Sequence, residues 1–422
     1  MTGVEGPPVS VVRLPSRASK VARRFVLRRD PAGAAPALDG LTLDYAAALN
    51  PQQLAAATAP DGPALVVAGA GTGKTRTLVY RVAYLVERGM RPEGIVLLTF
   101  TRRAARSMLT RAAALLDGRC EKVRGGTFHA FGLQVLRRHA ERLGVDRRFS
   151  VLDASDAADV LDVLRTEAGL HRSERRFPRK ATLYAIFSAA LNRDLDLADV
   201  LEERWPQYLV HLDALGALRD AYDAFKRANG LMDYDDLLAR PLELFERHDD
   251  VRRQVAGACR HVLVDEYQDV NRLQARLVEA LASVHGNVMA VGDDAQSIYR
   301  FRGADVAHIL GFPDRFPGTR LLKLEQNYRS TQPILDLANH VLQRATAKYD
   351  KTLFTETADG ELPALVQAPD ESWQSRFVCQ VVLDRREAGV PLGRMAVLFR
   401  SGWCSYDLET ELTRRRIPFV KY

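Results

Sequence analysis

Residues 64–80 read ALVVAGAGTGKTRTLVY, and this stretch decides the fold. It begins with a short apolar run, 64–67, which is typical of a buried strand. A glycine-rich turn follows, and residues 76–80 read as the start of a helix. Glycines let backbone N–H groups turn inward around a phosphate, and a helix N-terminus adds a partial positive charge. The stretch therefore predicts a strand–loop–helix site for a phosphate group.

The residues of the turn and of the first helical positions are the candidate phosphate ligands: Ala68, Gly69, Ala70, Gly71, Thr72, Gly73, Lys74 and Thr75. Lys74 can reach the β- and γ-phosphates of ATP, and the Thr75 hydroxyl can ligate Mg²⁺. The strict pattern has glycine where this chain has Ala68, but three glycines remain. The alternative is a glycine-rich turn that binds nothing, and the strand before it and the helix after it count against that interpretation.

A pair of acids, Asp265 and Glu266, follows a further apolar run at 261–264. At the end of a strand, Asp265 can hold Mg²⁺ through water, and Glu266 is placed to orient or deprotonate the attacking water. Adjacent acids at a strand end are common by chance. Together with the glycine-rich turn, however, this pair predicts hydrolysis of ATP with Mg²⁺.

The wider pattern predicts an open parallel sheet, because apolar runs end in polar residues at 64–67, 94–98, 261–264 and 288–291. Between the second and third runs, residues 131–232 read as helical and as an insertion into the α/β domain. One helix face there is formed by Leu215, Leu218, Tyr222 and Phe225. A second α/β pattern begins after about residue 325. In it we expect strands at 395–399 and 418–422 and a helix over 405–415.

Composition limits the class of protein. The net charge of the 422 residues is +7 and the pI is about 9.3, which favours a polyanionic partner such as nucleic acid. The four cysteines are far apart, so neither a zinc site nor a disulfide framework is expected. No apolar run approaches the ~20 residues of a membrane span, so no membrane partner is expected. The basic residues 1–30 read as a flexible arm that adds phosphate affinity, with an organelle transit peptide as the alternative.

These motifs and their order resemble the UvrD/Rep/PcrA family of superfamily 1 helicases, from about residue 43 to 422. In LNPQQ, 49–53, the resemblance implies that Gln53 reads adenine, and it places Arg76 beside the base. In VGDDAQSIYRFRGA, 291–304, Gln296 would sense the γ-phosphate. In EQNYRST, 325–331, Tyr328 would stack on adenine and Arg329 would act as an arginine finger across the cleft.

The resemblance also implies contacts with single-stranded DNA, through TFTRRAA at 99–105, GTFH at 126–129 and part of 291–304. The residues implied are Phe100, Thr101, Phe128, His129, Tyr299, Phe301 and Arg302. Aromatic side chains that stack on bases contribute about 1–3 kcal/mol each without sequence preference. Taken singly, Phe100, Phe301 and Tyr328 would be read as core residues, but their place within the matched motifs favours ligand contacts. The acids Asp235 and Asp236 read as structural, at a helix N-terminus, and not as a metal site.

The fold implied is a RecA-like P-loop domain with an inserted helical domain, plus the first part of a second RecA-like domain. The expected divisions are an arm and linker at 1–40, a motor domain at 41–130 and 233–325, the insertion at 131–232, and an incomplete second motor domain at 326–422. The family's motifs V and VI have no counterpart up to Tyr422. We therefore expect a fragment of a longer protein, then a truncated gene, then a genuine short form, in that order.

The function implied is an ATP-dependent DNA helicase or translocase that moves 3′ to 5′. Its partners would be single-stranded DNA and junctions of single- and double-stranded DNA, in a bacterial cytoplasm and at the nucleoid. The alternative is a module that binds ATP and single-stranded DNA without helicase activity of its own. A third interpretation, a P-loop relative with RNA or nuclease partners, stays open because stacking grooves accept both polymers.

Overall fold

The computed structural model describes residues 40–172, 176–300, 303–357 and 359–422. The arm and linker expected at 1–40 lie outside this part of the chain except for Gly40. The chain divides into two compact units, Met1–Gly360 and Glu361–Tyr422, and each is described by itself.

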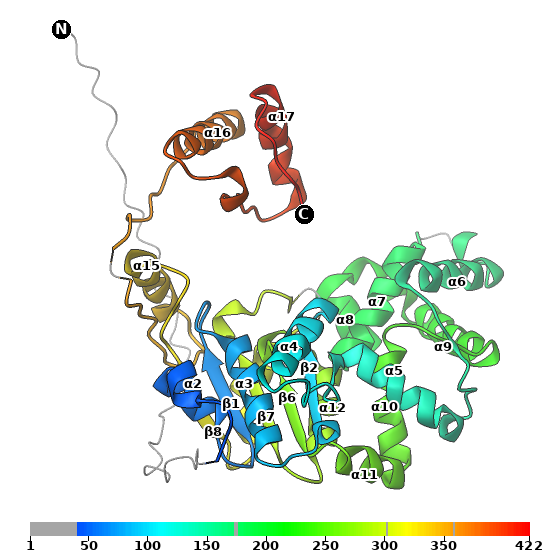
Figure 1. The fold of residues 1–422 in the computed structure, drawn as a ribbon. Helices are drawn as coiled ribbons and strands as arrows, with labels where there is room; N and C mark the ends of the chain where they lie inside the picture. Colours follow the sequence, from blue (N-terminus) through cyan, green and yellow to red (C-terminus); the bar gives the residue numbers. More distant parts are fainter. Residues whose placement is uncertain (1–39, 173–175, 301–302, 358) are drawn as a thin grey trace. The chain divides into compact units, whose positions relative to one another are not determined.

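The first unit is built on a parallel sheet of six strands in the order β3-β2-β6-β7-β1-β8 (Figure 1). The strands are β1 Ala64–Ala68, β2 Ile95–Thr99, β3 Arg124–Thr127, β6 His261–Val264, β7 Val288–Gly292 and β8 Arg320–Leu324. Every residue of β1, β2, β6 and β7 is buried, which explains why these four read as continuous apolar runs. The α/β class and these four strands are confirmed. The edge strands β3 and β8 are only partly buried and carry a mixed sequence that did not predict them.

Helices cover both faces of the sheet. On one face, alternate strand residues pack against α3 Lys74–Glu87 and α4 Arg102–Leu115. On the other face, the strand residues in between pack against α10 Asp236–Arg247, α11 Asp249–Gly257 and α12 Arg272–Ala282. The other helices outside the helical segment are α1 Tyr45–Ala48, α2 Pro51–Ala57, α13 Ala307–Leu310, α14 Phe312–Arg315 and α15 Gln332–Gln343, with 3₁₀ turns at η1 Pro92–Gly94, η5 Tyr267–Asp269 and η6 Asp294–Gln296.

The segment expected to be helical lies to one side of the sheet (Figure 1). Its elements are α5 Phe128–His139, η2 Ala140–Leu143, β4 Ser150–Val151, α6 Ala154–Glu167, η3 Leu170–Arg172, α7 Lys180–Arg193, α8 Leu197–Arg204, η4 Pro206–His211, α9 Leu212–Ala228 and β5 Leu231–Met232. Leu215, Leu218 and Tyr222 of α9 are buried in a separate core with α6, α7 and α8, so these three residues of the predicted helix face are confirmed. Phe225, the fourth, is only partly buried. Phe128 and Phe131 of α5, by contrast, pack into the core of the sheet. The domain boundaries at 131 and 232 stay a prediction.

The acids at 235 and 236 lie at a helix N-terminus, where the sequence placed them. Asp235 precedes α10, and Asp236 is its first residue. The Nζ atom of Lys226 lies 2.8 Å from the carboxylate of Asp233 and 2.7 Å from that of Asp236, and all three side chains are at most 5% exposed. Among the described residues no group of three or more His, Cys, Asp or Glu side chains could hold a metal ion.

The second unit contains α16 Glu371–Glu387, η8 Leu392–Arg394, η9 Gly402–Ser405 and α17 Tyr406–Arg414 around a small core with Cys379 and Leu412. The helix expected over 405–415 is confirmed. The strands expected at 395–399 and 418–422 are wrong, because neither segment pairs with any strand in the described part of the chain. Leu398 and Val420 are 94% and 73% exposed, and an apolar run becomes a strand only where a neighbour satisfies its backbone N–H and C=O groups. Across both units, no described helix combines the length and apolar character needed to cross a membrane.

Candidate nucleotide site and nucleic-acid pocket

The glycine-rich loop joins the end of β1 to the start of α3. Gly71 and Gly73 have φ of 71° and 88°, a left-handed conformation that glycine adopts without cost. The Nε2 atom of Gln53 donates to the carbonyl oxygen of Thr72 at 2.9 Å, and Gln53 is 2% exposed. The residue predicted to read adenine therefore lies against the loop and holds it from one side.

Lys74 and Glu266, both predicted to act on ATP, lie together. The Lys74 ammonium is 2.8 Å from Oε2 of Glu266, and the Nε2 atom of Gln268 donates to the same oxygen at 2.8 Å. Glu266 lies two residues after the end of β6 and has φ of 51°, a region in which residues other than glycine are strained and which is often found at functional sites. This backbone turn and the two donors fix the carboxylate beside the loop.

Asp265 has the features of a cation ligand. It is 4% exposed, and its Oδ1 atom has no hydrogen-bond partner among the described residues. Burial, and then the charge of Glu266, raise the pKa of Asp265 to about 7. A buried oxygen that the protein itself leaves without a donor suits a bound cation. With Thr75 in the first turn of α3, the residues present fit Mg²⁺.

The raised pKa of Asp265 gives a prediction for stability. Its folded state holds the proton more tightly than the unfolded state, so this stabilisation is complete below about pH 4 and is lost as the pH rises through 7. Asp265→Asn cannot ionise. Without nucleotide, the variant should therefore gain stability over the wild type between pH 5 and pH 8, by at most roughly 3 kcal/mol. Urea unfolding at both pH values measures this, and an equal difference at both would contradict it. Asp220→Asn, at an exposed position, is the control.

The segment with the predicted arginine finger packs directly on the loop. The Tyr328 backbone N–H donates to the carbonyl of Gly71 at 2.9 Å, and Nδ2 of Asn327 donates to that of Ala70 at 2.5 Å. Oδ1 of Asn327 accepts the backbone N–H of Arg329 at 2.7 Å, so the chain turns and brings Arg329 beside Gly71. The sequence analysis gave Asn327 no role, although an asparagine that closes such a turn on following N–H groups is a recognisable local signal.

The residues predicted to surround the base come from the starts of α2 and α3 and from this segment. The Tyr328 hydroxyl accepts from Nδ2 of Asn50 at 2.7 Å, while Tyr328 stays 57% exposed. Arg76 donates to the carbonyl of Ala48 at 2.7 Å. Gln296 lies after β7, and its Nε2 atom donates to Oδ2 of Asp293 at 2.6 Å. Stacking on adenine and sensing of the γ-phosphate stay predictions.

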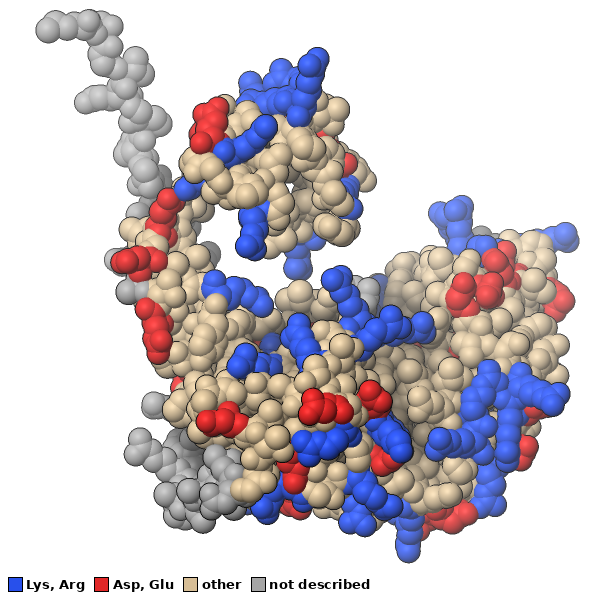
Figure 2. All heavy atoms as spheres, viewed as in Figure 1, with Lys and Arg blue, Asp and Glu red and all other residues tan. Residues whose placement is uncertain are grey.

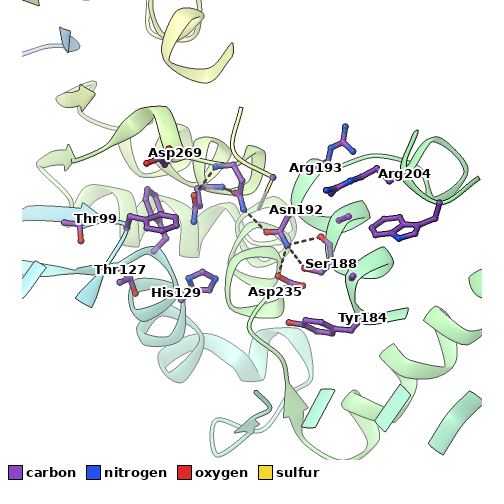
Figure 3. A pocket seen from close by; sticks show the side chains of 18 residues that line it. Thr99, Thr127, His129, Tyr184, Ser188, Asn192, Arg193, Arg204, Asp235 and Asp269 are labelled. Carbon is purple, nitrogen blue, oxygen red and sulfur yellow. Dashed lines mark hydrogen bonds between the residues drawn. The ribbon is translucent and has the colours of Figure 1, made fainter. Parts of the chain in front are cut away.

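A pocket of about 530 Å³ opens at the carboxyl edge of the same sheet, between the ends of β2 and β3 and helix α7 (Figure 3). Its lining includes the predicted DNA contacts Phe100, Phe128 and His129, and it continues onto Tyr184 and Trp205. Ligands of open α/β sheets bind at this edge. The structure thus places aromatic and polar side chains around one hollow next to the nucleotide residues.

The residues predicted to contact DNA differ in their contacts and in their exposure. The rings of Phe100 and Tyr299 are 5.1 Å apart, so these two come together. Thr101 uses its hydroxyl to cap α4 by accepting from Ala104 N at 3.1 Å, and Phe128 is only 3% exposed. Residues 301 and 302, predicted as Phe301 and Arg302 contacts, lie outside the described residues.

Asn192 joins three elements at the wall of this pocket, and the sequence analysis missed it (Figure 3). Its Nδ2 atom donates to the carbonyl of Ser188 at 3.0 Å and to Oδ1 of Asp235 at 2.7 Å. Its Oδ1 atom accepts from Nδ2 of Asn271 at 2.7 Å. Asn271 is the N-cap of α12 and comes two residues after Asp269. A polar path therefore connects the pocket with the segment that carries Asp265 and Glu266.

Comparison with known proteins indicates the same family as the sequence motifs. Residues 49–317 match the model of the UvrD/REP helicase N-terminal domain, and residues 322–422 match that of the UvrD-like helicase C-terminal domain. The chain belongs to the UvrD/Rep helicase family. Its similarity to the ATP-dependent DNA helicase PcrA of Staphylococcus aureus (strain Mu50) is 34% identity over 374 residues, which is 88% of this chain and 50% of that protein. The same-named protein of Staphylococcus epidermidis (strain ATCC 35984) is 33% identical over equal shares of both chains.

The chain spans about half the length of these relatives, and its membership of the UvrD/Rep family rests on the motifs and both domain models. Figure 2 shows Lys and Arg side chains spread over the face drawn, with Asp and Glu among them. The excess of seven positive charges favours a polyanionic partner in general.

Proposed function

We propose that this chain hydrolyses ATP with Mg²⁺ and couples hydrolysis to movement on single-stranded DNA as part of a DNA helicase. The observation that carries the proposal is the 2.8 Å pair of Lys74 and Glu266, which shares one sheet edge with the aromatic pocket. Lys74 would bind the transferring phosphate, and Glu266 would orient the attacking water. Thr75 and Asp265 would hold Mg²⁺, which neutralises charge on the phosphates when bound.

The remaining roles follow from position. Arg329, held at Gly71 by Asn327, would stabilise the charge that develops on the transferring phosphoryl group. Gln53, Arg76 and Tyr328 would hold the base. Because residues 322–422 belong to the family's C-terminal region, closure of this part over ATP would make a step along DNA depend on the nucleotide.

The DNA part of the proposal rests on the pocket. Phe100, His129 and Tyr299 would stack on or contact bases of one strand. Movement 3′ to 5′, preference for junctions, action at the nucleoid in the cytoplasm, and the division at residues 131, 232 and 325 are proposed from the family. Repair is the cellular process to which the family points.

The test is ATP hydrolysis by the 422-residue chain with and without a single-stranded oligonucleotide, beside binding of the same oligonucleotide. Stimulation of turnover by DNA is the expected result. Binding without turnover would favour the alternative, a module that binds ATP and DNA but is no motor by itself. Stimulation by single-stranded RNA but not by DNA would assign the partner to RNA, whereas equal stimulation would mean that the site accepts both polymers.

Asn192→Leu should weaken the coupling of DNA to hydrolysis. The leucine is close in size but cannot bridge Asp235 and Asn271, so the path between pocket and nucleotide segment is cut. We expect DNA stimulation to fall about tenfold, while turnover without DNA stays within about twofold of the wild type. Titration of the ATPase rate with oligonucleotide measures both. Asn229→Leu at the C-cap of α9, away from the pocket lining, is the control, and loss of stimulation there too would contradict a specific role.

A further inference from the structure

Lys351 lies outside every motif that the sequence indicated, yet its side chain is only 3% exposed. Its ammonium is 2.7 Å from Oδ1 of Asp293 and also contacts Oδ1 of Asp294. These two carboxylates are 4% and 3% exposed. A buried carboxylate pair needs a cation, because two like charges out of water disfavour each other's ionisation. We call these three residues the Lys351 triad.

The triad joins the two regions of the family. Asp293 and Asp294 directly follow β7, within the part that matches the N-terminal domain model, whereas Lys351 lies in the part that matches the C-terminal one. The backbone on either side of Lys351 is also held by hydrogen bonds. The backbone N–H of Tyr349 donates to Oδ2 of Asp294 at 3.2 Å, and that of Thr352 donates to Oε1 of Glu325 at 2.8 Å. Segment 349–352 is therefore bonded to Asp293 and Asp294 through Lys351 and Tyr349.

From Asp293 a continuous set of hydrogen bonds reaches the nucleotide residues. Its Oδ2 accepts from Nε2 of Gln296 at 2.6 Å. Its backbone N–H donates at 2.9 Å to Oε1 of Gln268, and Gln268 donates to Glu266, the partner of Lys74. With Oδ1 bound to Lys351 and Oδ2 to Gln296, the Asp293 carboxylate cannot rotate for one partner without releasing the other.

We propose that Lys351 is a positioning residue for ATP hydrolysis. Its ammonium fixes the carboxylate of Asp293, and through it the side chain of Gln296, so that the position of segment 349–352 sets the orientation of that glutamine. The inference rests on the proposed ATP hydrolysis. It predicts that loss of the ammonium lowers the rate of the chemical step and leaves affinity for ATP in place, which loss of a purely structural ion pair would not do selectively.

The experiment compares Lys351→Met, Lys351→Arg and Lys348→Met with the wild type. Lys348 is three residues away and donates to the carbonyl of Leu342 at 2.8 Å, outside the triad, so it serves as the matched control. We expect Lys351→Met to lower kcat of DNA-stimulated hydrolysis about tenfold with KM for ATP within about threefold of the wild type. Lys351→Arg, which keeps the cation, should restore most of kcat.

Hydrogen exchange of residues 293–297 without nucleotide gives a second readout that needs no activity. Exchange there should be faster in Lys351→Met than in the wild type and Lys351→Arg. If the wild type does not hydrolyse ATP, the proposed function fails, and exchange still decides the role of Lys351. Unchanged kcat and exchange in Lys351→Met, or equal damage by Lys351→Arg, would overturn the inference.

Folding of the variant is controlled with a double substitution. If Lys351→Met does not fold, Lys351→Met with Asp294→Asn removes one carboxylate together with the cation and leaves no like-charge pair. This protein should fold and still show the lowered kcat and the faster exchange at 293–297. A wild-type kcat and exchange in the double variant would mean that Asp293 needs no help from Lys351.

Discussion

Replacement of Lys74 by alanine is expected to abolish ATP turnover while the chain still binds single-stranded DNA. The ammonium is the cation that the structure places at the glycine-rich loop, 9% exposed and 2.8 Å from Glu266. Charge on the transferring phosphoryl group is stabilised mainly by such fixed cations. Its loss should reduce kcat on the order of 10³-fold, because removal of one such donor typically costs 10²–10³. The measurement is steady-state hydrolysis at saturating oligonucleotide.

The controls separate loss of chemistry from loss of fold. Lys122, whose side chain is 78% exposed, is removed in the same way, and Lys122→Ala should keep full turnover. Oligonucleotide affinity of Lys74→Ala should stay within about threefold, since the aromatic pocket and not the loop carries stacking. Turnover at the wild-type rate in Lys74→Ala would refute the assignment of the nucleotide site.

Local chemistry explains why the nucleotide residues could be predicted from the sequence. Residues 68–75 run from the end of a strand through one turn to the start of a helix. Their glycines, lysine and threonine form a pattern that can be recognised within a few residues. Asp265 and Glu266 are similarly marked by the apolar strand before them. Both features depend on only a few adjacent residues, so the strands and the loop could be predicted locally, while the binding of nucleotide there stays a prediction.

The polar connections could not be predicted, because their partners are far apart in the chain. Asn192 and Asn271 are separated by 79 positions, Asn192 and Asp235 by 43, and Lys351 and Asp294 by 57. An asparagine or lysine alone carries no signal for such a partner. The strand expected at 395–399 failed for the related reason that an apolar run predicts extended chain, whereas pairing depends on a neighbour that the run itself does not specify.

Arg329→Ala is expected to be nearly as damaging as loss of Lys74. Two bonds from Asn327 and Tyr328 to the loop carbonyls hold the backbone of Arg329 against Gly71, where even a Cβ on that glycine would lie 2.8 Å from Cβ of Arg329. Such proximity leaves the guanidinium within reach of a phosphate bound at the loop. A transition-state arginine is worth about 10³–10⁵ in kcat, so a loss on the order of 10³-fold is expected, with KM for ATP changed far less.

Lysine should not replace this arginine well. A guanidinium offers planar, paired donors that match phosphoryl oxygens, and lysine supplies only a point charge. Arg329→Lys should therefore recover less than about a tenth of the lost rate, which single-turnover hydrolysis measures directly. Arg344→Ala, at the exposed C-cap of α15, is the matched control and should be active. Full rescue by lysine would show that Arg329 contributes charge alone. A normal kcat in Arg329→Ala would mean that another residue supplies the catalytic cation.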